Sequence, residues 1–401
     1  SVFWGPDPSD PSRIIRTGRV QDTQDGLSEM PHVIVNQARL QEYLLEKMRK
    51  SPTRLEPDYG VEFVTLEVQP TGEHPVLVTL SENGRQFQLR AKYVVGCDGS
   101  RSGVRTAIGR ELHGDAANHA WAVLDTLSVT DYPDWRKKSL IQSSHAGNIL
   151  LIPREGGNMV RLYVDLGEVT DRDVLKAMTA EQVIATAQRV FAPYSLDVRE
   201  VAWFSVYEVG QRLTDKFDDV PSNEVGSRLP HVFVAGDACH THSAKAGQGM
   251  NVSMQDTFNL GWKLAAVLEG RSAQELLQTY SAERRAIGQN LIDFDREWSA
   301  TIAQPPVDPE HPELGGLEPG ALEAAFVESG RYTAGLATRY QQSVLTGGTL
   351  HQRLATGFPI GMRFHPTPVI RVGDAKKVEL GHAHEADGEP CSVLSRHAGR
   401  G

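Results

Sequence analysis

Two acidic residues each follow a short apolar run and precede a glycine-containing turn. Asp98 comes after the apolar residues 93–96, and Asp237 comes after 231–236. Runs of this kind are typical of strands in a parallel sheet that is covered on both faces. Because ligands bind at the carboxyl ends of such strands, each carboxylate is placed to accept a hydrogen bond from a sugar-type hydroxyl. For Asp98 an ordinary helix cap explains the segment equally well, whereas the Asp237 segment is more specific.

A glycine-spaced turn follows the second carboxylate. Gly247 and Gly249 stand on either side of Gln248, directly before a helix that we expect from about Met250. Glycine leaves no side chain where a flat ring or a phosphate approaches the backbone. The N–H groups at a helix N-terminus also stabilise negative charge. The turn therefore predicts a binding site for a ring that carries negative charge, and a purely structural glycine turn is the weaker interpretation.

Tyr163 lies in a segment that alternates as a strand does. Apolar residues at 160, 162, 164 and 166 alternate with Arg161, Tyr163 and Asp165, so the two sets face opposite sides of the strand. A tyrosine on the polar face can direct its hydroxyl into a cavity. From the residues alone, a tyrosine packed at a surface between domains is the alternative.

Other reactive side chains give weaker signals. His240 and His242 alternate with Thr241, but no third ligand stands near them in the sequence, so we expect no metal site. Lys137 and Lys138 either attract a substrate carboxylate or form a solvated turn, and we expect the solvated turn. We find no Ser-His-Asp arrangement, Walker loop or kinase signature in the sequence.

Composition narrows the class of protein. The 401 residues carry 41 Lys and Arg against 51 Asp and Glu, a net charge of −10, without a basic run, so nucleic acid is not an expected partner. Three widely spaced cysteines indicate neither a disulfide framework nor a thiolate zinc site, and they favour a reducing, cytoplasmic setting. No apolar run approaches the ~18 residues that span a bilayer, so we expect no membrane partner.

The segments around these residues predict an α/β protein. We expect a helix capped by Asn36, a hairpin turn at 82–84, a helix near 180–192, two long helices beginning near 250 and 280, and a helical stretch over 321–345. Six regions follow from this pattern: N-terminal loops and edge strands (1–31), the first part of one α/β domain (32–118), an inserted sheet domain (119–225), the second part of the α/β domain (226–300), a linker (301–320) and a C-terminal segment (321–401).

Five separated motifs occur in the order found in one family of flavoproteins. They are residues 36–40, 93–105, 152–155, 234–251 and 256–264. Together they resemble the single-component FAD-dependent aromatic hydroxylases typified by para-hydroxybenzoate hydroxylase. Their residues are similar to those of the phenol 2-monooxygenase and 3-hydroxybenzoate 4-monooxygenase branch. The resemblance covers about the first 300 residues and recurs near 357–384. It implies a para-hydroxybenzoate-hydroxylase-like FAD domain, here incomplete, with an inserted mixed-sheet substrate domain.

The resemblance also implies roles for residues of this sequence. Arg154 and Tyr163 match the active-site Arg and Tyr that face a phenolic substrate, and Tyr163 is expected to bind the phenolic oxygen. The other matched residues are expected to bind the cofactor: Gln37 and Arg39 at the FAD diphosphate and ribityl region, Asp98 and Gly99 at both FAD and NADPH, Gly236 and Asp237 at the ribityl chain, and Gly247, Gln248, Gly249, Met250 and Asn251 along the isoalloxazine.

The implied reaction inserts one oxygen atom of O2 into a phenolic ring, with FAD as cofactor and NADPH as electron donor. Deprotonation of the substrate hydroxyl raises the nucleophilicity of the ring carbon, and 3-hydroxybenzoate is slightly favoured over phenol. A homo-oligomer is expected for the complete protein. Two alternatives stay open: a flavin reductase or halogenase of similar fold, and a non-catalytic fragment.

The sequence departs from the family at three places. It has no strand followed by G-x-G-x-x-G, the element that seats the FAD pyrophosphate, so we expect a truncated chain that binds FAD poorly on its own, and the family's substrate-proximal Asp has no counterpart. After His384 the resemblance fades where the branch carries a thioredoxin-like domain, and 321–401 is expected to begin that domain. Ala244 stands where many relatives have Pro in the loop before Gly247.

Overall fold

The computed structural model describes residues 1–380 with short gaps. The gaps are residues 29, 31, 70, 169–171, 244–246, 306, 308–310, 312, 314, 319, 364 and 365. The expectations for Ala244 and for the tail that contains His384 therefore lie outside the described residues.

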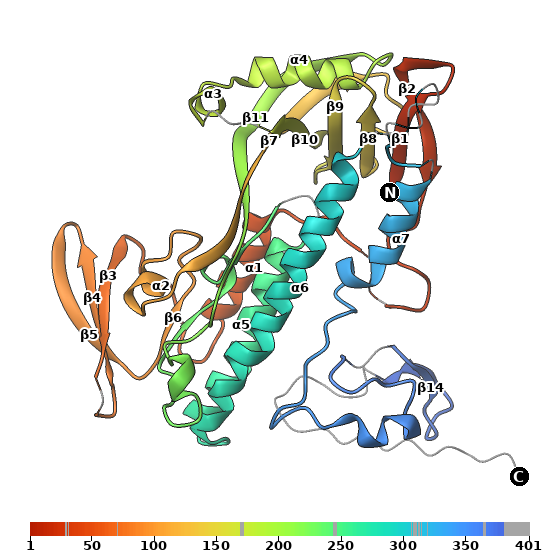
Figure 1. Ribbon diagram of the computed structural model, residues 1–401. Coiled ribbons are helices and arrows are strands. Elements are labelled where there is room, and N and C mark those ends of the chain that lie inside the picture. Colours follow the sequence, from red (N-terminus) through yellow and green to blue (C-terminus); the bar gives the residue numbers. More distant parts are fainter. Residues whose placement is uncertain are drawn as a thin grey trace, which may run out of the picture.

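An eight-stranded sheet forms the upper body of the molecule (Figure 1). Helix α4 (Ala180–Val190) begins at a capping box on Thr179 and buries Val183, Ala187 and Val190 against one face of this sheet. The other face turns toward the long helices. In spatial order the strands are β13 (His240–Thr241), β11 (Leu196–Thr214), β7 (Leu112–Thr130), β10 (Met159–Glu168), β9 (Gly147–Pro153), β8 (Ser139–Ser143), β1 (Val2–Asp7) and β2 (Asp10–Arg19).

The two longest strands connect the sheet to the rest of the chain. β7 and β11 are antiparallel and pair from Leu196↔Thr130 to Thr214↔Leu112. Beyond the sheet they continue downward as a two-stranded ribbon (Figure 1), and the far end of β11 pairs with β13. The ribbon therefore joins the strand that carries Tyr163 to the segment that follows Asp237.

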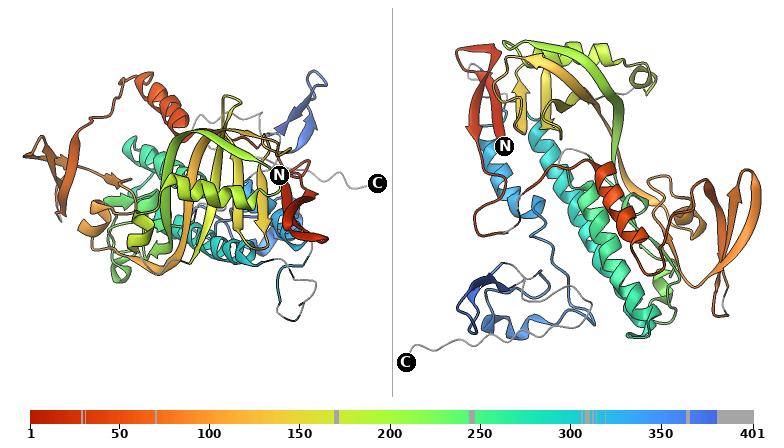
Figure 2. Two further views of the ribbon diagram at one scale, coloured as in Figure 1. Left: turned by 90° about the horizontal axis from the view of Figure 1, so that it is seen from above. Right: turned by 180° about the vertical axis from the view of Figure 1, so that it is seen from behind.

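Below the sheet, α5 (Gly249–Leu268) and α6 (Gln278–Ala303) run side by side (Figures 1 and 2). They pack on the two-stranded parallel sheet of β12 (Val232–Val234) and β6 (Val94–Gly96), whose apolar residues lie in one core with those of β3 and β4. All three residues of β12 are buried, as expected. The remaining elements below the sheet are β3 (Val61–Val68), β4 (Val76–Glu82), β5 (Arg85–Ala91), α2 (Gly103–Ala107), η1 (Ser222–Glu224), η2 (Gly236–Ala238) and η3 (Gln274–Leu277). Helix α3 (Arg172–Lys176) instead lies beside α4 at the top of the molecule (Figure 1).

Helix α1 (Gln37–Arg49) is the least packed long element. Asn36 caps it as predicted, its side chain accepting a 2.9 Å hydrogen bond from the Ala38 N–H. None of its residues is buried, and Tyr43 is 55% exposed. In the part of the chain that the structure covers, no helix is both long and apolar enough to cross a membrane.

Two expected boundaries differ from the structure. The N-terminal strands lie outside the expected sheet domain 119–225 in sequence, but β1 pairs in parallel with β8, so they extend the large sheet with β2 at its edge. Helix α7 (Ala321–Thr333) is shorter than the expected helical stretch 321–345, because Gly335 adopts a positive φ of 71° that ends the helix. The chain continues with η5 (Thr349–Leu354), β14 (Pro368–Ile370) and β15 (Lys377–Glu379).

Candidate functional site

A cavity of about 2340 Å³ lies between the sheet and the start of α5. Ligand sites usually measure about 300 to 1,000 Å³, so this one can hold a large cofactor together with a substrate. The first residues of α1 and the segment after α7 complete its walls. Among the predicted site residues, those lining it are Gln37, Arg154, Tyr163, Asp237, Gly247, Gln248, Gly249, Met250 and Asn251.

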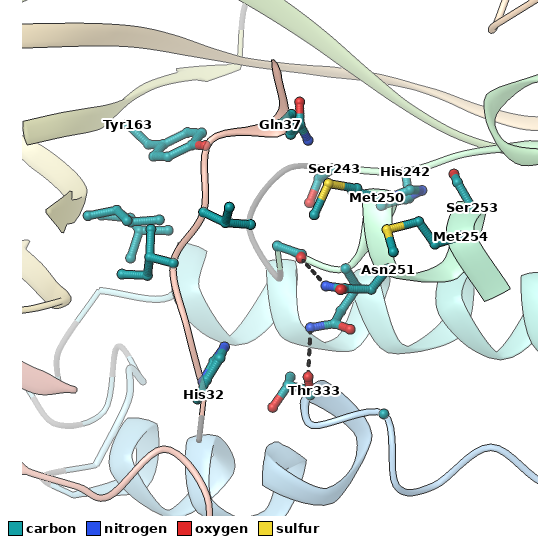
Figure 3. Close-up of a pocket in the computed structure, with 18 of the residues that line it drawn as sticks. His32, Gln37, Tyr163, His242, Ser243, Met250, Asn251, Ser253, Met254 and Thr333 are labelled. Carbon is teal, nitrogen blue, oxygen red and sulfur yellow. Dashed lines mark hydrogen bonds between the residues drawn. The ribbon is translucent and has the colours of Figure 1, made fainter. Parts of the chain in front are cut away.

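The glycine turn before α5 leaves its backbone open to the cavity. A Cβ atom on Gly249 would come within 2.6 Å of Nε2 of His242, so a side chain there would have to displace the His242 ring. Gln248, the N-cap residue, makes no side-chain hydrogen bond to the first turn of α5 and instead donates to the Thr333 carbonyl at 3.1 Å. Asn251 donates to the Gly247 carbonyl at 3.1 Å and closes the turn (Figure 3).

Asp237 lies just beyond the carboxyl end of the buried strand β12. Gly236 turns the chain with a φ of 64°, which favours glycine, and its N–H donates to Asp256 at 3.2 Å. The Asp237 side chain is exposed and lines the cavity. The flavin and ribityl parts of FAD need a carboxylate for the ribityl hydroxyls, a glycine backbone beside the flat ring and a helix N-terminus for negative charge. The residues of this site provide all three groups and therefore fit these parts of FAD.

Tyr163 enters the cavity from the sheet. Its strand β10 pairs with β7 through Tyr163↔Val123 and with β9 through Tyr163↔Leu150. The residues on the opposite face, Val160, Leu162 and Val164, are buried beneath α4, which confirms the predicted alternation. Figure 3 shows the Tyr163 ring on one side and Met250 and Asn251 on the other, with the segment that leads to Gln37 between them in this view.

Arg161 lies next to Tyr163 on the cavity face and is fully paired. Its Nε and Nη2 donate to the two carboxylate oxygens of Asp125, both at 2.7 Å, and its Cζ lies 5.0 Å from the ring centre of Trp203. Burial alone would lower the pKa of Arg161, but the hydrogen bonds with Asp125 and Tyr163 outweigh it and hold that pKa above its usual value. A neutralised, rigid ion pair therefore stands beside the Tyr163 hydroxyl.

Arg154 follows the last residue of β9 and lines the cavity with a side chain that is 12% exposed. Its Nη2 lies 3.5 Å from Oε1 of Glu155, a weak contact. Its Nε is buried and has no hydrogen-bond partner among the described residues. Since a buried donor without a partner is costly, this guanidinium is available to a ligand.

Lys138 corrects one expectation from the sequence. Lys137 is solvated and pairs with Asp134 at 2.9 Å, as expected for a turn. Lys138, however, is half-buried and lines the cavity, with its Nζ 5.1 Å from the ring centre of Phe326. Burial lowers the pKa of Lys138, although Asp22 opposes this. The cavity wall thus contains a cation that an anionic substrate group can neutralise.

The other predicted site residues do not line the cavity. Arg39 is exposed and pairs with Glu42 at 2.9 Å. Asp98 accepts hydrogen bonds from the Ser102 hydroxyl at 2.5 Å and the Val104 N–H at 3.0 Å, so it holds the start of α2. Gly99 turns the chain there with a φ of 79°. The capping interpretation of Asp98 thus describes its contacts, and its cofactor role stays a prediction, as does that of Arg39 and Gly236.

Within the described ranges, no group of three or more His, Cys, Asp or Glu side chains could hold a metal ion. His240 instead makes a 2.8 Å contact through Nε2 to the buried carboxylate of Asp256.

Sequence reasoning missed Arg161 and Lys138 as cavity residues, and Asp125 as the partner of Arg161. Arg161 was placed on the polar face of its strand, but its partner became visible only through the register Arg161↔Asp125 between β10 and β7. The signal for Lys138 was weak, because two adjacent lysines resemble a solvated turn. Only tertiary structure distinguishes the buried one from its neighbour.

Comparison with known proteins agrees with this geometry. Residues 13–295 match the family model of the FAD binding domain, and residues 338–389 match that of the phenol hydroxylase C-terminal dimerisation domain. The chain is 55% identical over 397 residues to 3-hydroxybenzoate 4-monooxygenase of Comamonas testosteroni, and 35% identical over 401 residues to a phenol 2-monooxygenase of Aspergillus fumigatus. Each alignment covers 96% of this chain and 62% of the relative, so the chain spans less than two thirds of their length.

Solved structures share the fold. The flavin-dependent monooxygenase PieE, solved with FAD and substrate, aligns with a TM-score of 0.68 at 20% identity over 94% of this chain and 70% of its own. CabE, an aromatic hydroxylase from angucycline biosynthesis, aligns with a TM-score of 0.62 at 25% identity over the same shares. The fold is therefore that of para-hydroxybenzoate hydroxylase, as expected. The chain belongs to the FAD binding domain family, in the branch of aromatic hydroxylases that includes 3-hydroxybenzoate 4-monooxygenase and phenol 2-monooxygenase.

Proposed function

We propose that the protein carrying this chain hydroxylates a phenolic substrate that bears a carboxylate, with 3-hydroxybenzoate as the first candidate. The observation that carries this proposal is a single cavity lined by a tyrosine hydroxyl, a half-buried lysine and an open glycine turn. The 55% identical relative is a 3-hydroxybenzoate 4-monooxygenase. When bound at the glycine turn, FAD supplies the redox chemistry, with NADPH as the proposed electron donor and O2 as the source of oxygen.

The sheet side of the cavity is proposed to bind the substrate. The Tyr163 hydroxyl hydrogen-bonds the phenolic oxygen and stabilises the negative charge that develops there, which raises the nucleophilicity of the ring carbon. Lys138 pairs with the carboxylate, because an anion brought into a buried site needs a positive partner. Arg154, with its unpaired Nε, is a further donor to the substrate.

The flavin side is proposed to hold the cofactor. Asp237 accepts hydrogen bonds from ribityl hydroxyls, and the N–H groups at the start of α5 stabilise negative charge on the ring. Gln37 is proposed to contact FAD from the start of α1. The match of residues 338–389 to a dimerisation domain supports a homo-oligomer. Degradation of aromatic compounds in the cytoplasm is the proposed setting.

The proposed function is tested on the full-length protein reconstituted with FAD. We expect NADPH oxidation coupled to a hydroxylated product, with 3-hydroxybenzoate preferred to phenol. Lys138→Met should raise the KM for 3-hydroxybenzoate about ten- to a hundredfold and leave phenol nearly unaffected, because it removes a charge-assisted hydrogen bond that only the carboxylate makes. Lys137→Met is the matched control, since its side chain is solvated.

Two outcomes contradict the proposal. Equal losses for both substrates in Lys138→Met would show that the lysine does not recognise a carboxylate. If neither phenolic compound yields a hydroxylated product while NADPH is consumed, the activity is that of a flavin reductase and the proposed hydroxylation is wrong.

A further inference from the structure

A buried polar network lies beneath the flavin side of the cavity. It contains two ion pairs, Arg284–Asp256 at 2.6 Å and Lys263–Glu283 at 2.6 Å, each joining α5 to α6. Arg284, Asp256 and Lys263 are fully buried, and Glu283 is 6% exposed. Asp256 and Lys263 belong to the 256–264 sequence motif, for which the proposed chemistry gives no role. The contacts of this network with the rest of the chain therefore indicate what Asp256 and Lys263 do.

Through Asp256 the network contacts the turn formed by Gly236 and Asp237. Besides Arg284, the Asp256 carboxylate binds Nε2 of His240 at 2.8 Å and accepts from the Gly236 N–H at 3.2 Å. Gly236 directly precedes Asp237, the proposed ribityl ligand. Because both Asp256 oxygens are in use, a shift of Arg284 must move either the carboxylate or the Gly236 turn.

The network also reaches the segment after α7, through Tyr340. The Tyr340 hydroxyl accepts hydrogen bonds from Nη1 of Arg284 at 3.1 Å and from Nδ2 of Asn259 at 3.3 Å. Asn259 in turn donates to Glu283 at 2.8 Å and accepts from Lys263 at 2.8 Å. A single hydroxyl from outside the two helices thus joins both buried ion pairs.

The backbone around Tyr340 is itself closely fixed. Its N–H donates to the Gly361 carbonyl at 2.9 Å, and a Cβ atom on Gly361 would come within 2.1 Å of the Tyr340 carbonyl oxygen, so only glycine fits opposite. Tyr340 and Gly361 both line the cavity. Thr333, at the end of α7, accepts from Gln248 at the N-cap of α5 (Figure 3). The segment after α7 is therefore one wall of the flavin site.

We propose that Tyr340 is a positioning residue of the flavin site, which fixes the Gly236–Asp237 turn through Arg284 and Asp256. The proposal rests on the proposed function, in which this turn holds the ribityl chain. Without the Tyr340 hydroxyl, Arg284 and Asn259 each lose a partner in a buried site. The guanidinium then seeks another acceptor, and Asp256 no longer holds Gly236 in one place.

Two variants close to Tyr340 in the chain, one at the end of α7 and one in the segment after it, serve as matched controls. Tyr332 carries a buried hydroxyl with no hydrogen-bond partner among the described residues, so Tyr332→Phe removes a similar atom from outside the network. Arg339 is exposed and donates to the Ile360 carbonyl at 3.1 Å, so Arg339→Met loosens the segment beside Tyr340 without touching the ion pairs.

The test is an FAD titration of the full-length apoprotein, followed by flavin fluorescence, for the wild type and three variants. Tyr340→Phe should raise the Kd for FAD about tenfold, because a charge-assisted hydrogen bond is lost. It should also shift the flavin absorbance bands of the bound form, a change that a general loss of stability does not cause. Tyr332→Phe and Arg339→Met should change the Kd less than about twofold.

Unchanged affinity and spectrum in Tyr340→Phe would overturn the inference while the wild type still binds FAD. Equal weakening in all three variants would also overturn it, because the segment would then act through its stability and not through the hydroxyl. A wild-type protein that binds no FAD would overturn both the inference and the proposed function. The thermal midpoint of each apoprotein identifies any variant that has lost its fold.

Discussion

Tyr163 and the Gly247–Asn251 turn face the same cavity but are held by different means. Tyr163 stands on a strand that is paired on both sides, and the opposite face of that strand packs in an apolar core. The turn begins a helix whose buried side includes two charged residues, Asp256 and Lys263, which are held by ion pairs to α6 and by the hydrogen bonds around Tyr340. An apolar core loses stability in proportion to the contacts removed, whereas a broken ion pair leaves a whole charge without a partner. The flavin side should therefore respond more sharply to single substitutions.

The largest effect is expected for Arg284→Met. The change leaves the buried Asp256 carboxylate with an uncompensated charge, which should lower the free energy of unfolding by about 3 to 5 kcal/mol. Denaturant unfolding measures it. Arg39→Met is the control, since the exposed Arg39–Glu42 pair should contribute less than about 1 kcal/mol. Similar losses in the two variants would show that burial of the Arg284–Asp256 pair does not set the size of the effect.

Tyr163→Phe tests the sheet side. Strand β10 stays paired between β7 and β9, so FAD and substrate should still bind, while single-turnover hydroxylation should slow about ten- to a hundredfold through loss of one hydrogen bond of about 1 to 3 kcal/mol. Tyr207→Phe is the comparison, because Tyr207 also lines the cavity but lies against Trp203. Unaltered hydroxylation kinetics in Tyr163→Phe would reject its role.

The variant Arg161→Met tests whether the Arg161–Asp125 ion pair on the sheet is as sensitive to substitution as the two ion pairs between α5 and α6. The buried Asp125 carboxylate would lose its partner, and its uncompensated charge would repel an anionic substrate beside Tyr163, so the Kd for 3-hydroxybenzoate should rise about tenfold. The double variant Arg161→Met with Asp125→Asn removes both charges and should recover much of the affinity. No recovery would mean that Arg161 binds the substrate directly.

The acid stability of the protein provides a further comparison. Burial alone would raise the pKa of Asp256, but His240 and Arg284 outweigh it and hold that pKa below 3.8. The stability from this group is therefore fully present above pH 3.8 and is lost as pH falls through the lowered value. Asp256→Asn should reduce the slope of unfolding free energy against pH below 3.8. An identical slope in wild type and variant would contradict this.

The smallest effect is expected on α1. Because Tyr43 is more than half exposed and α1 buries no residue, Tyr43→Ala should change the unfolding free energy of the 401-residue chain by less than about 0.5 kcal/mol. Leu124→Ala, in the core beneath Tyr163, should cost about 2 to 5 kcal/mol. A large loss from Tyr43→Ala would show that α1 contributes more to folding than its contacts suggest.

Local patterns predicted what is local in this structure. The Asn36 cap, the buried strand β12 and the two faces of β10 follow from residues within a few positions of each other. The glycine turn and Asp237, which were singled out from a short run of neighbouring residues, line the cavity, and their ligand-binding roles stay predictions.

Contacts between distant residues were beyond prediction. Arg161 and Asp125 are 36 residues apart and meet only in one strand register, and Asn259 and Tyr340 are 81 apart. Lys138 and Lys137 have the same side chain, so only the packing around them separates a cavity residue from a solvated one. The end of α7 at Gly335 was missed because apolar residues continue beyond it.

The length of the β7–β11 ribbon also sets the distance between the Tyr163 strand and the segment after Asp237. Each strand has 19 residues and, at about 3.3 Å per residue, spans roughly 60 Å. The upper part of the ribbon pairs with the Tyr163 strand, and its lower end pairs with β13, which follows Asp237 in the sequence. A matched insertion of two residues in both strands would separate the two sites by about 7 Å with every face preserved. A single-residue insertion would instead turn the side chains beyond it to the wrong face. Along a regularly paired part of this ribbon, the distance between the two sites therefore changes in steps of two residues.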